Sequence, residues 1–159
     1  MTESKRELLR HTIATLAYRG GKALRGAPPD FRTFRIGDTT RTPVEILAHI
    51  GDLLEWMLHL LNGQHFWKSS TPGGWETEVG RFFELLGRVD GHLASERELE
   101  STPEKLFQGP VADALTHVGQ IALLRRLAGS PVRGENYFKA DISLGRVGSH
   151  HPAPRVEFE

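Results

Sequence analysis

Apolar residues recur every three to four positions in four long segments of this chain, which is the spacing of amphipathic helices. The four segments are residues 3–23, 43–61, 76–95 and 110–128. No segment of useful length shows the alternation of apolar and polar residues that is typical of a half-buried strand. The pattern therefore predicts an all-α protein built as a four-helix bundle.

The second of these segments has the clearest start signal in the chain. Thr42 suits the N-cap, Pro43 the first helical position, and Glu45 the return arm of a capping box. Asn62 and Gly63 supply the stop, because either residue accepts a left-handed backbone conformation. These signals fix the register of the second helix, and with it the direction of each of its side chains.

A short extra helix and an irregular C-terminal tail complete the predicted fold. In STPEKLFQG, a Ser/Thr cap and Pro103 begin a helical turn that Gly109 ends. Gly and Pro become frequent from about residue 130. There we expect ENYFKADI to pack its aromatic rings onto the bundle, and SHHPAPRVEFE to be mobile or to contact a partner. All 159 residues, tail included, are assigned to one domain with a single core.

Composition excludes several classes of function. Lys+Arg and Asp+Glu balance at 20 each, which disfavours a nucleic-acid partner. The absence of cysteine excludes disulfides, thiolate zinc sites and a cysteine nucleophile. The first twenty residues resemble a charged helix rather than a signal peptide, and no run of about 18 apolar residues occurs. We therefore expect a cytoplasmic protein with no membrane span.

Two ionisable residues lie on the face of the last long helix that should be buried. Asp113 and His117 are four residues apart, so their side chains are neighbours and can contact one cation. His49, on the flank of the apolar arc of the second helix, is the candidate third ligand. The same pattern also fits a plain Asp–His pair and a hydrogen-bonded core histidine, and the pattern alone favours this structural interpretation.

Four further residues are candidates for the surroundings of this site. Asp52 follows His49 by three positions and is either a partner of its imidazole or a solvated surface acid. Gln120 either orients a bound water or is an ordinary polar helix residue. Trp56 and Tyr137 either form walls of a substrate pocket or pack in the core.

The segments EILAHIGDLLEWML, ALTHVGQIALLRRLAG and RGENYFKADI resemble the DinB-like superfamily of damage-inducible and YfiT-type proteins. The resemblance covers about residues 42–142, and its most specific parts are H-x-G-Q and the histidine of LAHIGD. It implies a four-helix bundle, often dimeric, in which three histidines hold a divalent metal. One histidine comes from the second helix, and two that are four residues apart come from the last long helix.

Carried over by position, the resemblance implies His49 and His117 as metal ligands and places Asp113 where the family usually has histidine. A set of two histidines and one carboxylate suits Zn, Ni, Fe(II) or Mn with open coordination positions. The departure from three histidines is also compatible with a weakened or lost site.

Two functions follow from the resemblance. The first is a metal-dependent hydrolase or thiol-dependent transferase for a small molecule, with water or a low-molecular-weight thiol as the nucleophile. The second is a non-catalytic, stress-related helical dimer whose metal is structural or lost. A structural site would be closed by a fourth ligand such as His150, His151 or a tail carboxylate, whereas a catalytic site keeps a position open. The tail histidines are otherwise a surface pair that can bind metal adventitiously. The resemblance implies a homodimer, which fits either function.

Overall fold

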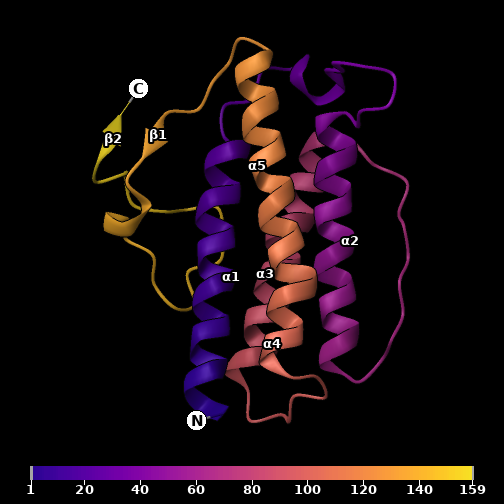
Figure 1. Cartoon of the computed structure of the whole chain (residues 1–159), viewed down its shortest axis with the longest axis vertical. Helices are drawn as coiled ribbons and strands as arrows, with labels where there is room; N and C mark the ends of the chain where they lie inside the picture. Colours follow the sequence, from indigo (N-terminus) through magenta and orange to yellow (C-terminus); the bar gives the residue numbers. More distant parts are fainter. Residues whose placement is uncertain (1, 159) are drawn as a thin grey trace.

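The computed structural model describes residues 2–158, in which four long helices pack together (Figure 1). They are α1 (Thr2–Leu24), α2 (Pro43–Leu61), α3 (Trp75–Ala94) and α5 (Ala112–Leu127). Helices α1 and α2 each pack against both α3 and α5. The predicted all-α four-helix bundle is confirmed, and each of these helices begins and ends within two residues of its expected bounds.

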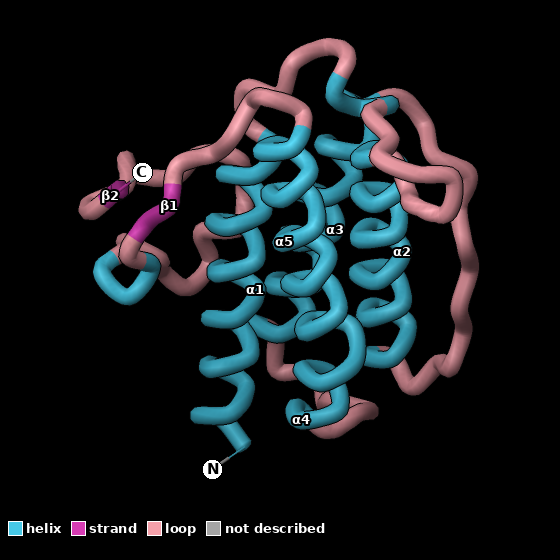
Figure 2. The backbone as a smooth tube through the Cα atoms, turned by 45° about the horizontal axis from the view of Figure 1, so that its top comes forward, coloured by secondary structure: helices cyan, strands magenta, loops and turns pink. Residues whose placement is uncertain are grey.

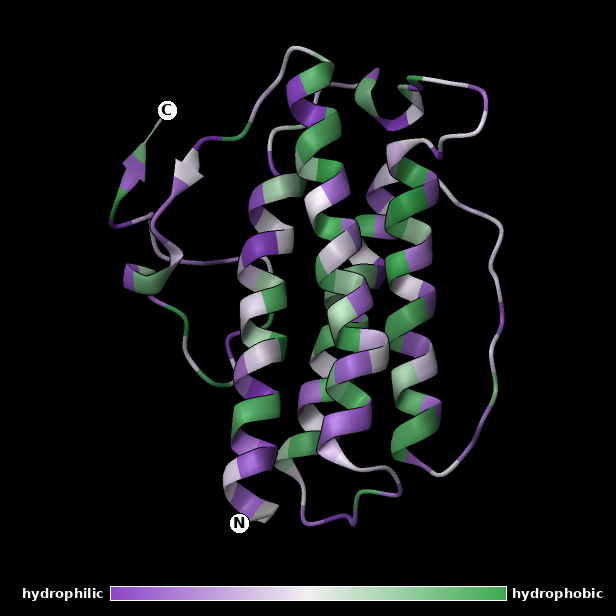
Figure 3. Ribbon diagram, viewed as in Figure 1, coloured by the Kyte–Doolittle hydropathy of each residue, from purple (hydrophilic) through white to green (hydrophobic). Residues whose placement is uncertain are grey.

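The core fills the space between the four helices. Figure 3 shows apolar residues interspersed with polar ones along each of the four long helices. Every long helix contributes fully buried apolar side chains, among them Ile13, Leu16, Leu47, Leu54, Phe82, Leu86 and Ile121. None of the helices within residues 2–158 is long and apolar enough to cross a membrane.

The start of α2 is built as the sequence predicts. The Thr42 hydroxyl accepts a hydrogen bond from the Glu45 amide, and the Glu45 carboxylate accepts one from the Thr42 amide. Gly63 takes a φ of 73° just after the helix ends. The preceding connection contains a short 3-10 turn, η1 (Phe31–Thr33), whose Phe31 side chain is buried in the core.

The expected stop at Gly109 is wrong. Helix α4 (Pro103–Leu106) continues through a wide turn, η2 (Phe107–Val111), directly into α5. Pro110 lies inside this wide turn, which accommodates a residue that lacks a backbone N–H. Gly109 lies against α2 instead, where a Cβ would stand 3.5 Å from the Trp56 ring. The short helix and α5 therefore form one continuous helical segment.

The irregular C-terminal tail contains a pair of strands that the sequence pattern did not predict, because each strand is two residues long. Strand β1 (Gly134–Glu135) pairs antiparallel with β2 (Glu157–Phe158), and the chain between them begins with the turn η3 (Tyr137–Lys139) (Figure 2). The buried Glu135 carboxylate accepts hydrogen bonds from the Tyr18 hydroxyl and from the Lys22 ammonium. These contacts fix the tail to the outer side of α1.

Candidate metal centre

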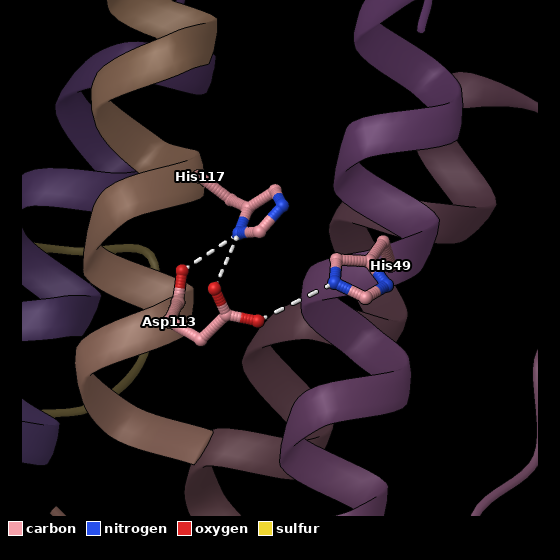
Figure 4. A group of neighbouring side chains, drawn as sticks. All are labelled: His49, Asp113 and His117. Atoms are coloured by element: carbon pink, nitrogen blue, oxygen red, sulfur yellow. Dashed lines mark hydrogen bonds and ion pairs between the residues drawn. The ribbon is translucent and has the colours of Figure 1, made fainter. Parts of the chain in front are cut away.

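Helices α2 and α5 bring His49, Asp113 and His117 together (Figure 4). Each residue offers one ligand atom, and these three atoms lie within 4.8 Å of one another. Asp113 stands between the two rings, with Oδ2 3.6 Å from His49 Nε2 and Oδ1 3.4 Å from His117 Nδ1. The centroids of the two imidazole rings are 4.5 Å apart. The three predicted residues thus form one group that can hold a metal ion.

The orientation of His117 is fixed by its own helix. Its Nδ1 lies 2.7 Å from the backbone oxygen of Asp113, one turn earlier. A carbonyl oxygen only accepts hydrogen bonds, so Nδ1 carries the proton and Nε2 keeps its lone pair. An Nδ1–H bond to a backbone carbonyl is a common way to orient a metal-binding histidine. His117 is therefore arranged to bind a cation through Nε2.

The site is open on the side of the carboxylate. The side chains of His49 and His117 are 20% and 12% exposed, whereas that of Asp113 is 46% exposed. The expectation of a buried Asp113 is therefore wrong, and the residue lies at the mouth of the seam between α2 and α5.

Burial lowers the pKa of His49, and unfavourable electrostatic interactions with His117 and Arg41 lower it further. The neighbouring Asp113 opposes these effects but does not outweigh them. A neutral imidazole is the form that binds metal, so the surroundings of His49 favour binding near neutral pH.

Trp67 is a neighbour of the site that sequence reasoning missed. It lies on the extended segment 62–74, which runs alongside α2 (Figure 2). Its ring meets His49 edge-on with centroids 5.7 Å apart, and it meets Trp56 at 5.8 Å. Trp56, which the sequence predicts as a wall of a substrate pocket, thus packs against Trp67. The only sequence signal was an aromatic residue in a loop, which carries no periodicity.

Asp52 is neither a surface acid nor a partner of His49. Its carboxylate is buried, accepts a hydrogen bond from Arg81 at 2.8 Å and accepts another from the Ser70 amide at 3.0 Å. Arg81 also contacts Ser70 Oγ at 3.3 Å. Asp52 therefore ties the segment that carries Trp67 to α2 and α3.

The other candidates are not members of the metal-capable group. Gln120 is exposed on α5. Tyr137 packs against α1, with its ring centroid 6.3 Å from that of Tyr18. The His151 ring packs against the same Tyr18, at 5.5 Å. Within residues 2–158 the metal-capable group consists of His49, Asp113 and His117, with neither tail histidine as a fourth member.

The sequence matches no family model, no curated protein and no solved structure.

Proposed function

We propose that this chain is a DinB-like metal-binding protein in which His49, Asp113 and His117 hold one divalent transition-metal ion. The proposal includes an activity, that of a hydrolase or thiol-dependent transferase for a small molecule. The observation that carries the metal site is the convergence of three ligand atoms within 4.8 Å from two helices. The resemblance of H-x-G-Q and LAHIGD to that superfamily supports the family.

The donor set fits a divalent ion of the first transition series. Two imidazoles and a carboxylate suit Zn, Ni, Fe(II) or Mn. Ligand atoms about 2.1 Å from a shared ion are at most about 4.2 Å apart, and small side-chain rotations bring donors within 4.8 Å to that spacing. His117 is already oriented by the Asp113 carbonyl. The site therefore requires no movement of α2 or α5.

The open side of the group favours a catalytic over a structural ion. A structural site is closed by four protein ligands, whereas a catalytic site uses three and leaves a position free. The described chain supplies three, and Asp113 is half-exposed. An ion bound here would supply Lewis acidity and lower the pKa of a water or thiol in contact with it.

The chain's own residues position the reacting groups. With no cysteine in the sequence, the nucleophile comes from solution as water or a low-molecular-weight thiol. Burial keeps His49 neutral, and the Trp67 ring shields it from solvent. The homodimer and the thiol co-substrate rest on the family resemblance alone.

Metal content of tag-free protein tests the site directly. We expect about one equivalent of Zn, Ni, Fe or Mn by inductively coupled plasma mass spectrometry, and loss of that equivalent in His117→Ala. The matched control is His11→Ala, an exposed histidine on α1 that should leave metal content unchanged.

Two substitutions at Asp113 test whether its carboxylate binds the metal. Asp113→Ala is expected to weaken binding at least tenfold, and Asp113→His, which creates a three-histidine set, is expected to keep the metal. Equal metal content in Asp113→Ala and wild type would remove Asp113 from the ligand set. Once the bound metal is known, the protein loaded with that metal can be screened for hydrolase and thiol-transfer activity.

The rival function is a non-catalytic helical protein in which the three residues satisfy one another. The Asp113 carboxylate lies within ion-pair distance of both imidazoles, at 3.4 and 3.6 Å, which is compatible with this alternative, although both distances are long for hydrogen bonds. Wild-type protein that stays metal-free after supplementation with all four metals would establish the rival and overturn the proposed activity.

A further inference from the structure

A hollow lies on the other side of α5 from the candidate metal centre. It has a volume of about 320 Å³, is partly open to solvent and is lined by α1, α5 and the beginning of the tail. The residues that define its chemistry are Arg19, Lys22, Gly119, Ala122, Val132 and Tyr137. Its volume is at the lower end of the range for small-molecule sites, about 300–1,000 Å³.

The hollow is separate from the group formed by His49, Asp113 and His117. Gly119 follows His117 by two residues, which turns it about 200° around the helix axis. His117 faces α2, and Gly119 therefore faces the side of α5 where α1 and the tail lie. Ligands can occupy the two places independently.

Arg19 is the available cation in this hollow. Its guanidinium lies 4.0 Å from the centre of the Tyr137 ring, and no residue in the described part of the chain accepts a hydrogen bond from it or forms an ion pair with it. An aromatic ring holds a guanidinium flat and leaves its in-plane N–H donors free for a carboxylate. Lys22 is already engaged, by Glu135 at 2.7 Å and Glu157 at 3.5 Å.

The side of the hollow that α5 lines is mainly apolar, with Thr116 as its polar member and Gly119 and Ala122 as its small residues. A Cβ added to Gly119 would meet nothing within 4 Å, and Ala122 follows it by three residues on the same face. Larger side chains at these positions would fill the hollow. The walls therefore suit an apolar molecular body, while Arg19 suits an anionic group at its edge.

We propose that this hollow binds a small apolar carboxylic acid, with the carboxylate on Arg19 and the apolar body against Gly119 and Ala122. The Tyr137 ring holds the guanidinium in place and closes the site from the tail.

The test uses 2-naphthoate as the probe, followed by amide chemical shifts of ¹⁵N-labelled protein. We expect saturable shifts at Gly119 and Ala122. Arg19→Gln is expected to weaken binding at least tenfold, because a charge-assisted bidentate contact is lost. The neutral analogue 2-naphthalenemethanol is expected to bind wild type as weakly as naphthoate binds the variant.

A second variant blocks the space rather than the charge. Gly119→Leu projects into the hollow and is expected to abolish binding, while Gly87→Leu, at an exposed and open position on α3, is expected to leave it unchanged. A cooperative thermal unfolding transition in both variants is the control for correct folding. Binding of naphthoate to His117→Ala with wild-type affinity would show that the site is independent of the metal centre.

Three results would overturn the proposal. One is the absence of saturable shifts up to millimolar naphthoate. Another is a set of shifts centred on Leu8 and Phe107, which line a separate apolar hollow between α1 and α4. The third is equal affinity of wild type and Arg19→Gln for naphthoate, which would show that Arg19 does not bind the carboxylate.

Discussion

Trp67 is an intrinsic fluorophore next to the candidate metal site. Its ring stands 5.7 Å from that of His49, close enough for a paramagnetic ion bound there to quench its fluorescence. The other two tryptophans are Trp56, one ring further from His49, and Trp75, which packs on Phe31 in the core.

We therefore predict that Co²⁺ or Ni²⁺ quenches tryptophan emission in a saturable way. Trp67→Phe should remove the larger part of the quenching while leaving the metal content unchanged. Trp75→Phe is the matched control: it should leave the amount of emission lost on metal binding nearly unchanged, so that the quenched fraction of the remaining emission rises. Quenching that survives in Trp67→Phe would place the bound ion elsewhere. A fluorescence titration on the three proteins gives the answer.

His92, in the last turn of α3, is a buried ionisable residue with a stability consequence. Its Nε2 is buried, and none of the described residues gives it a hydrogen-bond partner. Burial lowers the pKa of His92, and the positive charges of Arg97 and Arg6 lower it further. The folded protein therefore takes up this proton at a lower pH than the unfolded chain does.

The free energy of unfolding should consequently fall as the pH drops from about 6.5, the usual histidine value, through the lower folded-state pKa. Above that window the contribution of His92 is fully present. His92→Leu should flatten this pH dependence, and should raise stability at pH 7.5 by about 1 kcal/mol because an unsatisfied polar atom is removed. His92→Gln, which also cannot titrate, should flatten the slope equally. Urea unfolding between pH 7.5 and 5.5 measures both effects; variants with the wild-type slope would exclude His92 as its source.

Helices were predictable here because their signals are local. The capping box of Thr42 and Glu45 and the apolar period of α2 and α5 lie within each segment, so they fixed the faces that carry His49 and His117. The wide turn at Gly109 was not predictable, since a Gly–Pro pair more often ends a helix than widens it. The extended segment 62–74 has no period at all. Its position over His49 depends on a distant acid, Asp52.

Gly20 shows how one small residue sets the distance between two helices. Any side chain at this position would place its Cβ 2.5 Å from the Phe82 ring on α3, which is well inside the van der Waals contact distance. Helix α1 continues past this glycine to Leu24, close to the predicted end at residue 23.

We predict that Gly20→Ala is less stable than Gly87→Ala by about 1–3 kcal/mol, the usual cost of overpacking a core. Both changes gain the same helix propensity, about 1 kcal/mol, so the comparison isolates the clash. Gly87 is a suitable control because a Cβ there meets nothing within 4 Å. Equal unfolding free energies of the two variants in urea would mean that α1 and α3 separate without cost.

Across the molecule as a whole, the tail is attached through contacts that no local pattern reveals. Lys22 and Glu135 are 113 positions apart, and Tyr18 and Glu135 are 117 apart. The three side chains are nevertheless buried together, with the Glu135 side chain fully inaccessible to solvent. A sequence reading finds the helices that carry Tyr18 and Lys22, but it cannot tell that a carboxylate from the tail neutralises the lysine.

Removing Glu135 should therefore release the tail. Glu135→Ala leaves the Lys22 ammonium, 9% exposed, without its closest partner, and breaking a buried pair in this way costs about 3–5 kcal/mol. Glu157→Ala is the control, because the Glu157 side chain is 27% exposed and lies 3.5 Å from the same ammonium; its loss should cost about 1 kcal/mol or less. Urea unfolding measures the difference, and limited trypsin digestion should cut Glu135→Ala first within residues 133–155.

The same variant connects the tail to the two proposed sites. Tyr137 follows Glu135 by two residues and forms the ring on which Arg19 stacks, so releasing the tail should abolish naphthoate binding. His49, Asp113 and His117 lie on α2 and α5 and should keep their metal, because none of them contacts the tail in the described structure. Loss of both ligands together in Glu135→Ala would show that the tail supports the whole bundle, whereas loss of naphthoate alone would show that it serves as a wall of one site.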